Sequence, residues 1–173
     1  MPSEYTYPYI SGTGKAGTCH GVPLKPATPH TGVPMASATL KGHVSITSNS
    51  YSAVMDGIAN IGPLAVSVDA GAWHDYETGV FSGGNQTSPT LDHLVQLVGY
   101  GTDKELGDYW IIRNSWTPLW GEKGFMLLKR FTDGDHCGID VNPLDGNGCK
   151  GGPPTVKVCG QNGVLYDAVY PLV

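Results

Sequence analysis

A histidine and an asparagine are the two residues whose types and spacing best suit proton-transfer chemistry in this sequence. His93 stands at the start of an apolar segment and Asn114 at the end of the next one. Facing residues of an antiparallel hairpin have a constant sum of residue numbers, so if Tyr100 faces Gly107, His93 faces Asn114. The Asn114 carboxamide oxygen would then accept from one ring N–H of His93. The other ring nitrogen would remain free to exchange a proton with a nucleophile.

The elements that must position this pair are short strands and one helix. Apolar segments bounded by turn residues predict strands at 64–68, 94–100, 108–113 and 125–130. The polar residues 48–50 can cap a short helix that carries Val54 and Ile58 on one face. Residues 133–163 are rich in Gly, Asp, Asn and Pro and predict a loop. The expected fold class is α+β, with an antiparallel barrel or half-barrel.

The composition supports a folded chain and excludes several classes of partner. The 173 residues are 40% hydrophobic and 14% charged, and the 25 glycines and 13 prolines favour turns and short strands. A net charge of -5 gives no basic surface for nucleic acid, and no apolar run approaches the roughly 18 residues of a membrane span. The histidines and cysteines form no H-E-x-x-H or C-x-x-C pair, so we predict no metal and no cofactor.

The cysteines and one asparagine are candidates for modification. Cys149 and Cys159 bracket a short Gly/Pro-rich stretch and can form a local disulfide, although their spacing alone does not prove it. Asn85 begins an Asn-Gln-Thr sequon in a polar turn region, so it is a candidate glycosylation site. Together these features favour an oxidising compartment.

Two longer motifs resemble those of the papain-like cysteine proteases, and among them the cathepsin L-like members. The first resembles the family's catalytic-histidine strand, and it is LDHLVQLVGYG at 91–101. The second resembles its asparagine motif, and it is YWIIRNSW at 109–116 followed by WGEKGF at 120–125. Weaker similarities occur in the family's order, at YPY (7–9) with Gly12 and Cys19, GPLAVSVDA (62–70), CGI (137–139) and YPLV (170–173).

This resemblance implies a fold, a domain organisation and an activity. Residues 1–26 would be the end of the left domain and the crossover, and residues 27–173 the right, β-barrel domain of the papain-like fold. An insertion loop would occupy about 143–166. The implied activity is peptide-bond hydrolysis through a thioester intermediate. The resemblance does not distinguish an endopeptidase from an exopeptidase.

The resemblance also implies roles for five residues around the histidine. His93 would be the general base and acid, and Asn114 would orient it. Trp116 would shield this pair from water, and Trp120 would help line the leaving-group side of the cleft. Asp92 either caps the entry to the strand or tunes the charge on His93, and we favour the capping role.

Three further positions match a substrate pocket. Ser67 and Leu94 match positions that help to form the pocket for the residue before the scissile one. The residue at the position of Leu94 is usually small, so this pocket is expected to be narrow. Asn142 is expected to reach the floor of the pocket.

The sequence departs from the family pattern at the nucleophile. The Cys-Gly-Ser-Cys-Trp signature and the upstream glutamine of the oxyanion hole are absent, and no cysteine present opens a helix. Cys19 is followed by a turn-forming stretch, and the usual partner of Cys137 is missing, so Cys137 can pair within the insertion instead. We therefore expect a partial sequence, inactive alone, whose partners are the N-terminal half of the same protease, peptide or protein substrates and cystatin-type inhibitors.

Two alternatives remain open. A non-catalytic papain-like module would serve in binding or regulation, and the sequence upstream would distinguish it by the residue at the cysteine position. A secreted β-rich binding protein would instead place the side chains of His93 and Asn114 far apart. Family habit implies a lysosomal, vacuolar or secreted location.

Overall fold

The computed structural model describes Lys15, residues 40–132 and residues 136–173. The predicted domain boundary at 26/27 lies outside these residues, as does Cys19. The segment His43–Tyr170 forms one compact unit. In the other unit, the backbone N–H of Lys41 donates to the carbonyl of Leu172 at 2.8 Å. No helix among the described residues is long and apolar enough to cross a membrane.

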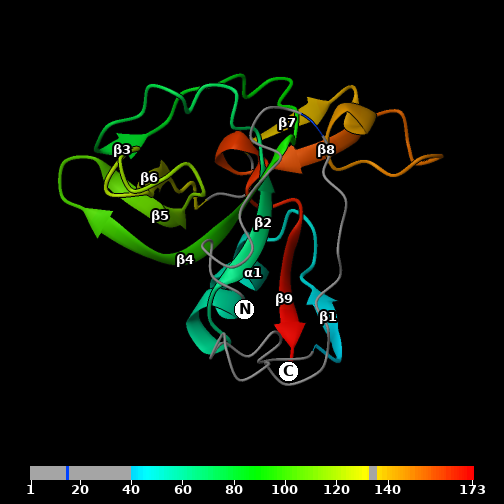
Figure 1. Cartoon of the computed structure of the whole chain (residues 1–173), viewed down its shortest axis with the longest axis horizontal. Helices are drawn as coiled ribbons and strands as arrows, with labels where there is room; N and C mark the ends of the chain where they lie inside the picture. Colours follow the sequence, from blue (N-terminus) through cyan, green and yellow to red (C-terminus); the bar gives the residue numbers. More distant parts are fainter. Residues whose placement is uncertain (1–14, 16–39, 133–135) are drawn as a thin grey trace, which may run out of the picture. The chain divides into compact units, whose positions relative to one another are not determined.

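The described residues form a mainly antiparallel sheet with one α-helix, and Figure 1 shows these elements. The elements are β1 (Gly42–Ser45), α1 (Tyr51–Asn60), β2 (Leu64–Val68), β3 (Val80–Phe81), β4 (His93–Asp103), β5 (Gly107–Arg113), β6 (Phe125–Lys129), β7 (Cys137–Asp140), β8 (Val156–Cys159) and β9 (Ala168–Leu172), with short 3-10 helices η1 (Pro143–Asp145) and η2 (Gln161–Gly163). Seven strands form one sheet in the order β1-β9-β2-β4-β5-β6-β3, and β7 and β8 form a separate hairpin. The pair β3 and β6 is parallel, whereas β4 runs antiparallel to both of its neighbours.

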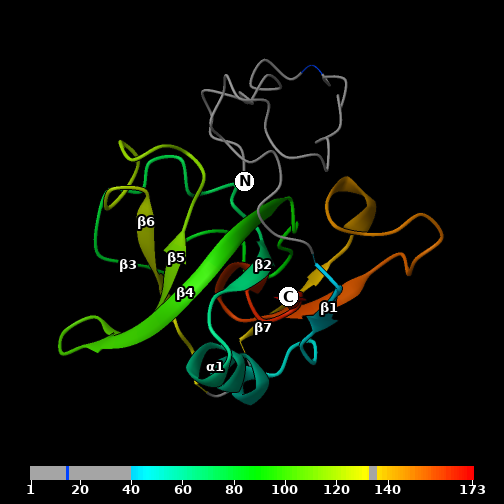
Figure 2. The same ribbon diagram turned by 60° about the horizontal axis from the view of Figure 1, so that its bottom comes forward.

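The helix α1 begins where the sequence predicts it. The Ser50 side chain accepts from the backbone N–H of Ala53 at 3.3 Å and caps the first turn. The helix buries Val54 and Gly57 and lies beside β2 and β4 (Figure 2). Gly57 allows close packing there, because a Cβ would lie 2.7 Å from a methyl group of Ile46 and 3.3 Å from one of Leu64 on β2.

The β4–β5 hairpin has a different register from the one predicted. Tyr100 pairs with Trp110 instead of Gly107, and Asp103 pairs with Gly107. Both strands extend further into the expected loop, because the Asp103 carboxylate accepts two backbone N–H groups of a tight turn and Gly107 has a positive φ of 80°. These two N–H donors, those of Leu106 and then Glu105, lower the pKa of Asp103. A register shift between Leu97 and Gly99 changes the alignment toward the start of β4.

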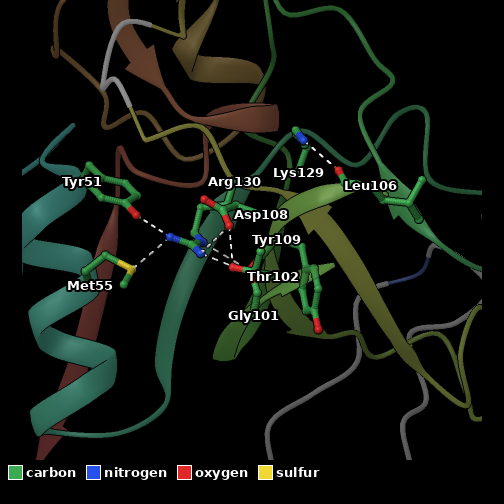
Figure 3. A network of polar contacts seen from close by, with 9 residues as sticks. All are labelled: Tyr51, Met55, Gly101, Thr102, Leu106, Asp108, Tyr109, Lys129 and Arg130. Atoms are coloured by element: carbon green, nitrogen blue, oxygen red, sulfur yellow. Dashed lines mark hydrogen bonds and ion pairs between the residues drawn. The ribbon is translucent and has the colours of Figure 1, made fainter. Parts of the chain in front are cut away.

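A buried arginine ties α1 to this hairpin, as Figure 3 shows. Arg130 forms an ion pair with Asp108 at 3.3 Å and donates to the carbonyl of Gly101 at 3.2 Å. It also donates to the Tyr51 hydroxyl of α1 and lies 5.5 Å from the centre of the Trp110 ring. The guanidinium charge is therefore neutralised and hydrogen-bonded on several sides, as a buried cation requires.

The predicted insertion loop is wrong over its second half. Val156–Cys159 forms β8, which pairs with β7, and the residues from Val158 to Leu165 are buried. The high glycine content there reflects tight packing, since a Cβ at Gly163 would lie 2.4 Å from the Leu91 side chain.

The predicted disulfide between Cys149 and Cys159 is also wrong. Cys159 bonds to Cys137, its direct partner across the β7–β8 hairpin, with a Cα–Cα distance of 3.9 Å. Cys149 is free and exposed. This agrees with the alternative that Cys137 pairs within the insertion. The pairing of β7 with β8 determines which cysteines bond, because it brings together two cysteines that are 22 positions apart in the sequence.

Candidate active site

The side chains of His93 and Asn114 meet at the open end of the β4–β5 hairpin. His93 Nε2 lies 2.9 Å from Asn114 Oδ1, and this same oxygen accepts the backbone N–H of Ser115 at 2.7 Å. Of the two polar atoms of the Asn114 carboxamide, only the oxygen can accept a hydrogen bond. The Ser115 N–H therefore fixes which way the amide points. His93 Nε2 must therefore be the protonated donor, and Nδ1 is left as the basic nitrogen.

The side chains of these two residues meet as predicted, but the residues are not direct cross-strand partners, because the predicted register was wrong. Gln96 pairs with Arg113, so Asn114 directly follows the last paired residue of β5, and His93 lies at the start of β4. Asn114 is buried, with 9% of its surface exposed, while His93 is half-buried. The backbone N–H of Asn114 donates to the carbonyl of Gly124 at 2.9 Å, which holds the strand end in place. The pair therefore combines a buried carboxamide with an imidazole that solvent can reach.

Trp116 lies against the histidine, as predicted. Its ring centre is 5.2 Å from that of His93, with an interplanar angle of 31°. Its indole also stacks on the His74 imidazole at 4.9 Å and 5°, a contact that no sequence signal predicted. Trp120 contacts Trp116 edge-on at 5.4 Å.

Trp120 is held by residues that sequence reasoning missed. Its indole N–H donates to the carbonyl of Trp73 at 3.0 Å, and its ring lies 5.5 Å from that of Tyr76. The Tyr76 hydroxyl donates to the carbonyl of Gly79 at 2.8 Å and accepts the N–H of Leu127 at 3.1 Å. Burial raises the pKa of Tyr76 to about 12, and the nearby Glu122 carboxylate adds to this rise, although the Leu127 N–H opposes it.

Asp92 lies at the entry to β4 and bonds to a neighbouring loop. Its carboxylate accepts the backbone N–H of Ala70 at 3.2 Å. Asp69 in the same loop accepts the N–H of Thr90 at 3.3 Å. These contacts tie the start of β4 to the segment that follows β2.

Ser67 on β2 and Leu94 on β4, the two residues predicted to form a substrate pocket, are cross-strand neighbours. Ser67 is buried and Leu94 is 61% exposed. The Ser67 hydroxyl donates to Asp167 Oδ2 at 2.7 Å, so a carboxylate that the sequence did not single out lies at this pair. A pocket here would therefore combine an apolar wall with an acidic group.

Asn142 and Asn85 have local partners. The Asn142 amide donates to Asp145, and not to Ser67, and the residue is exposed. Asn147 instead reaches toward Asp167, at 3.5 Å. Asn85 is exposed, and its side chain accepts the N–H of Ser88 at 3.1 Å.

A hollow of about 490 Å³ lies directly beside Asn114. It is lined by Gln96, Val98, Arg113, Asn114, Ser115, Thr117, Pro118, Lys123, Gly124 and Phe125. Arg113 and Lys123 give this hollow two exposed cations, and no carboxylate lines it. In the described part of the chain no group of three or more His, Cys, Asp or Glu residues could hold a metal ion.

The fold and the His–Asn pair define a class of protein, the cysteine peptidases of the papain type. The sequence pattern of the papain family cysteine proteases matches residues 1–147. The chain belongs to this family.

Known proteins similar to this chain fall in the same class. A cathepsin L-like peptidase of Aedes aegypti is 34% identical over 140 residues, which cover 79% of this chain and 41% of that protein. A cathepsin L-like protein of Caenorhabditis elegans is 38% identical over 130 residues, covering 69% and 38%. The chain thus spans about two fifths of the length of these curated relatives.

Solved structures show the same papain-like fold. The bromelain protease of Ananas comosus, determined with the E64 inhibitor, has a TM-score of 0.65 at 29% identity and covers 99% of this chain and 62% of its own. The digestive procathepsin L2 of Tenebrio molitor has a TM-score of 0.67 at 26% identity, covering 99% and 42%. The α+β, papain-like fold predicted from the sequence is confirmed.

Proposed function

We propose that this chain supplies the histidine–asparagine half of a cysteine peptidase site. The observation that carries the proposal is the hydrogen bond between His93 Nε2 and Asn114 Oδ1, whose orientation the Ser115 N–H fixes. It leaves Nδ1 of His93 as the proton acceptor for a thiol. Family membership supports the reaction class.

In the proposed reaction, His93 Nδ1 accepts the thiol proton, and the thiolate attacks the peptide carbonyl. The C–N bond then breaks, the leaving amine takes the proton from His93, and an acyl thioester remains. A water molecule, deprotonated by His93, hydrolyses the thioester and restores the thiol. Asn114 keeps the ring oriented through both proton transfers, and Trp116 limits access of water to its hydrogen bond.

The nucleophile is proposed to come from a segment outside these 173 residues. Of the described cysteines, Cys137 and Cys159 form a disulfide and Cys149 is exposed. The hollow beside Asn114 has room and cationic groups for that segment, so we propose that it packs there through an acidic side chain. The chain alone is then expected to hydrolyse no peptide.

The alternative is a non-catalytic papain-like module, and the position of these cysteines is what favours it. The coding sequence upstream separates the two functions. A cysteine that opens a helix indicates the peptidase, and a serine or glycine at that position indicates the module.

The substrate is proposed to be a peptide or protein, with cystatin-type inhibitors as further partners. The disulfide between Cys137 and Cys159 supports an oxidising compartment, which a lysosomal, vacuolar or secreted location would provide.

The experiment is covalent labelling of the full-length gene product with E64, the inhibitor present in the bromelain structure. We expect the wild type to bind one label per molecule and His93→Ala to bind none. Hydrolysis of a peptide substrate should be present in the wild type and lost in His93→Ala in the same way. His43→Ala, an exposed histidine on β1, is the matched control and should keep both signals. An unlabelled wild type, or labelling of His93→Ala at the wild-type rate, would rule out the proposed function.

A further inference from the structure

His74 takes no part in the mechanism above, yet its ring lies against the site. The imidazole is stacked on the Trp116 indole, with 4.9 Å between ring centres and 5° between planes. The same indole contacts the His93 ring at 5.2 Å. One tryptophan therefore links the exposed His74 to the proposed general base.

The residues on either side of His74, Trp73 and Tyr76, are both anchored in the core. Trp73 is fully buried, and its indole N–H donates to Asn162 Oδ1 at 3.3 Å. Tyr76 is buried too, and its backbone N–H donates to the carbonyl of Trp73 at 3.1 Å. His74 is thus presented from a short turn anchored at both ends, so its ring can act as a fixed surface.

Trp116 is partly buried against the hydrophobic core, and ring contacts hold the rest of its indole. Its indole N–H makes no hydrogen bond to another described residue, and its neighbours along the chain are exposed. Thr117 has a positive φ of 73°, and Leu119 is 96% exposed. Among the described residues, the rings that contact the indole, apart from His93, are His74 and Trp120.

We infer that His74 is a positioning residue that holds Trp116 over the hydrogen bond between His93 and Asn114. The parallel stack restricts tilting of the indole, and the indole keeps water from the Nε2–H of His93. Its importance for catalysis depends on the proposed function, but the contact itself does not.

The test is nitrogen-15 NMR of the chain, measuring how fast the Nε2–H proton of His93 exchanges with water. In His74→Ala we expect exchange about tenfold faster, because the indole is free to move and open the hydrogen bond. His74→Phe preserves a flat ring and should restore the wild-type rate. His43→Ala should leave the rate unchanged, and thermal melts verify that each variant is folded.

Three results would overturn the inference. They are an unchanged rate in His74→Ala, a rate in His74→Phe as fast as in His74→Ala, or equal acceleration in His43→Ala. The measurement needs no nucleophile, so its failure is distinguishable from failure of the E64 labelling that tests the proposed function.

Discussion

At the scale of single residues, the Asn114 carboxamide oxygen serves two donors at once. The backbone N–H of Ser115 fixes the amide, and the amide fixes His93. In the full-length protein we predict that Asn114→Ala lowers kcat by about a hundredfold, since a misoriented imidazole loses part of its acid–base contribution. Steady-state kinetics measure this, and Asn60→Ala on α1 is the control. A kcat within about twofold of wild type would contradict the orienting role.

Asp167 is the residue we expect to set substrate preference. Its carboxylate accepts from Ser67, next to the exposed Leu94. We predict that the full-length enzyme favours a basic side chain in the residue before the scissile one, and that Asp167→Asn reduces this preference about tenfold. Competing peptide libraries measure the ratio of kcat/KM values. Equal selectivity in Asp167→Asn and wild type would show that the carboxylate does not face the substrate.

At the scale of elements, the β7–β8 hairpin is closed by the disulfide between Cys137 and Cys159. The loop that it closes spans 22 positions, and its removal is expected to cost about 3 kcal/mol of unfolding free energy. Denaturant unfolding of Cys159→Ser should show this loss. Cys149→Ser, at a free and exposed cysteine, should match the wild type. Similar losses in both variants would count against the assigned pairing.

Arg130 connects α1 to the β4–β5 hairpin (Figure 3). Arg130→Ala removes a buried cation and leaves Asp108 and the Gly101 carbonyl without it, which we expect to cost about 3 kcal/mol. Lys129→Ala, which removes a contact to the exposed Leu106 carbonyl, should change stability by less than about 0.5 kcal/mol. Denaturant unfolding compares the two, and equal losses would mean that the guanidinium contacts contribute little.

Tyr76 packs against Trp120 and makes the stability of the fold depend on pH. Burial favours the neutral phenol, so the pKa of Tyr76 in the fold, about 12, lies above its ordinary value of 10.0. The resulting stabilisation is complete below pH 10 and is lost as the pH rises from 10 to 12. Tyr76→Phe should lack this part of the alkaline loss, whereas Tyr100→Phe should retain it. Melting temperatures from about pH 8 to 12 measure the difference, and parallel curves for wild type and Tyr76→Phe would refute it.

At the scale of the molecule, the sequence predicted the strands and the reactive pair far better than the C-terminal region. The segment 64–68 and the Ser50 cap were predictable because their signals are local, in apolar runs and a capping side chain. The segment 143–166 was misjudged because its glycines are needed for close packing against Leu91, which composition cannot distinguish from a loop.

The site was only partly predictable, because some of its residues come together only through tertiary contacts. His93 and Asn114 are carried by adjacent strands, so a hairpin argument can join them. His74 and Asp167 reach the site through tertiary contacts from a turn and from the segment before β9. A constant sum of residue numbers also cannot predict a bulge that shifts the register. The side chains of His93 and Asn114 meet despite this shift.

The hollow beside Asn114 leads to a prediction for the whole protein. Arg113 and Lys123 line it without a carboxylate, so an acidic group of the nucleophile-bearing segment should meet them there. Arg113→Glu in the full-length protein is expected to lower its melting temperature through like-charge repulsion. Lys104→Glu, the same change on an exposed hairpin loop, should have little effect. Equal shifts in both variants would place the segment elsewhere.

The most direct test of the central claim is the protonation state of the neutral His93 ring, read by long-range nitrogen–proton NMR on the selectively labelled chain. We predict that Nε2 carries the proton and Nδ1 does not, and that Asn114→Ala turns this single form into a mixture of the two tautomers. A neutral ring protonated at Nδ1 in the wild type, or no change in Asn114→Ala, would contradict the account.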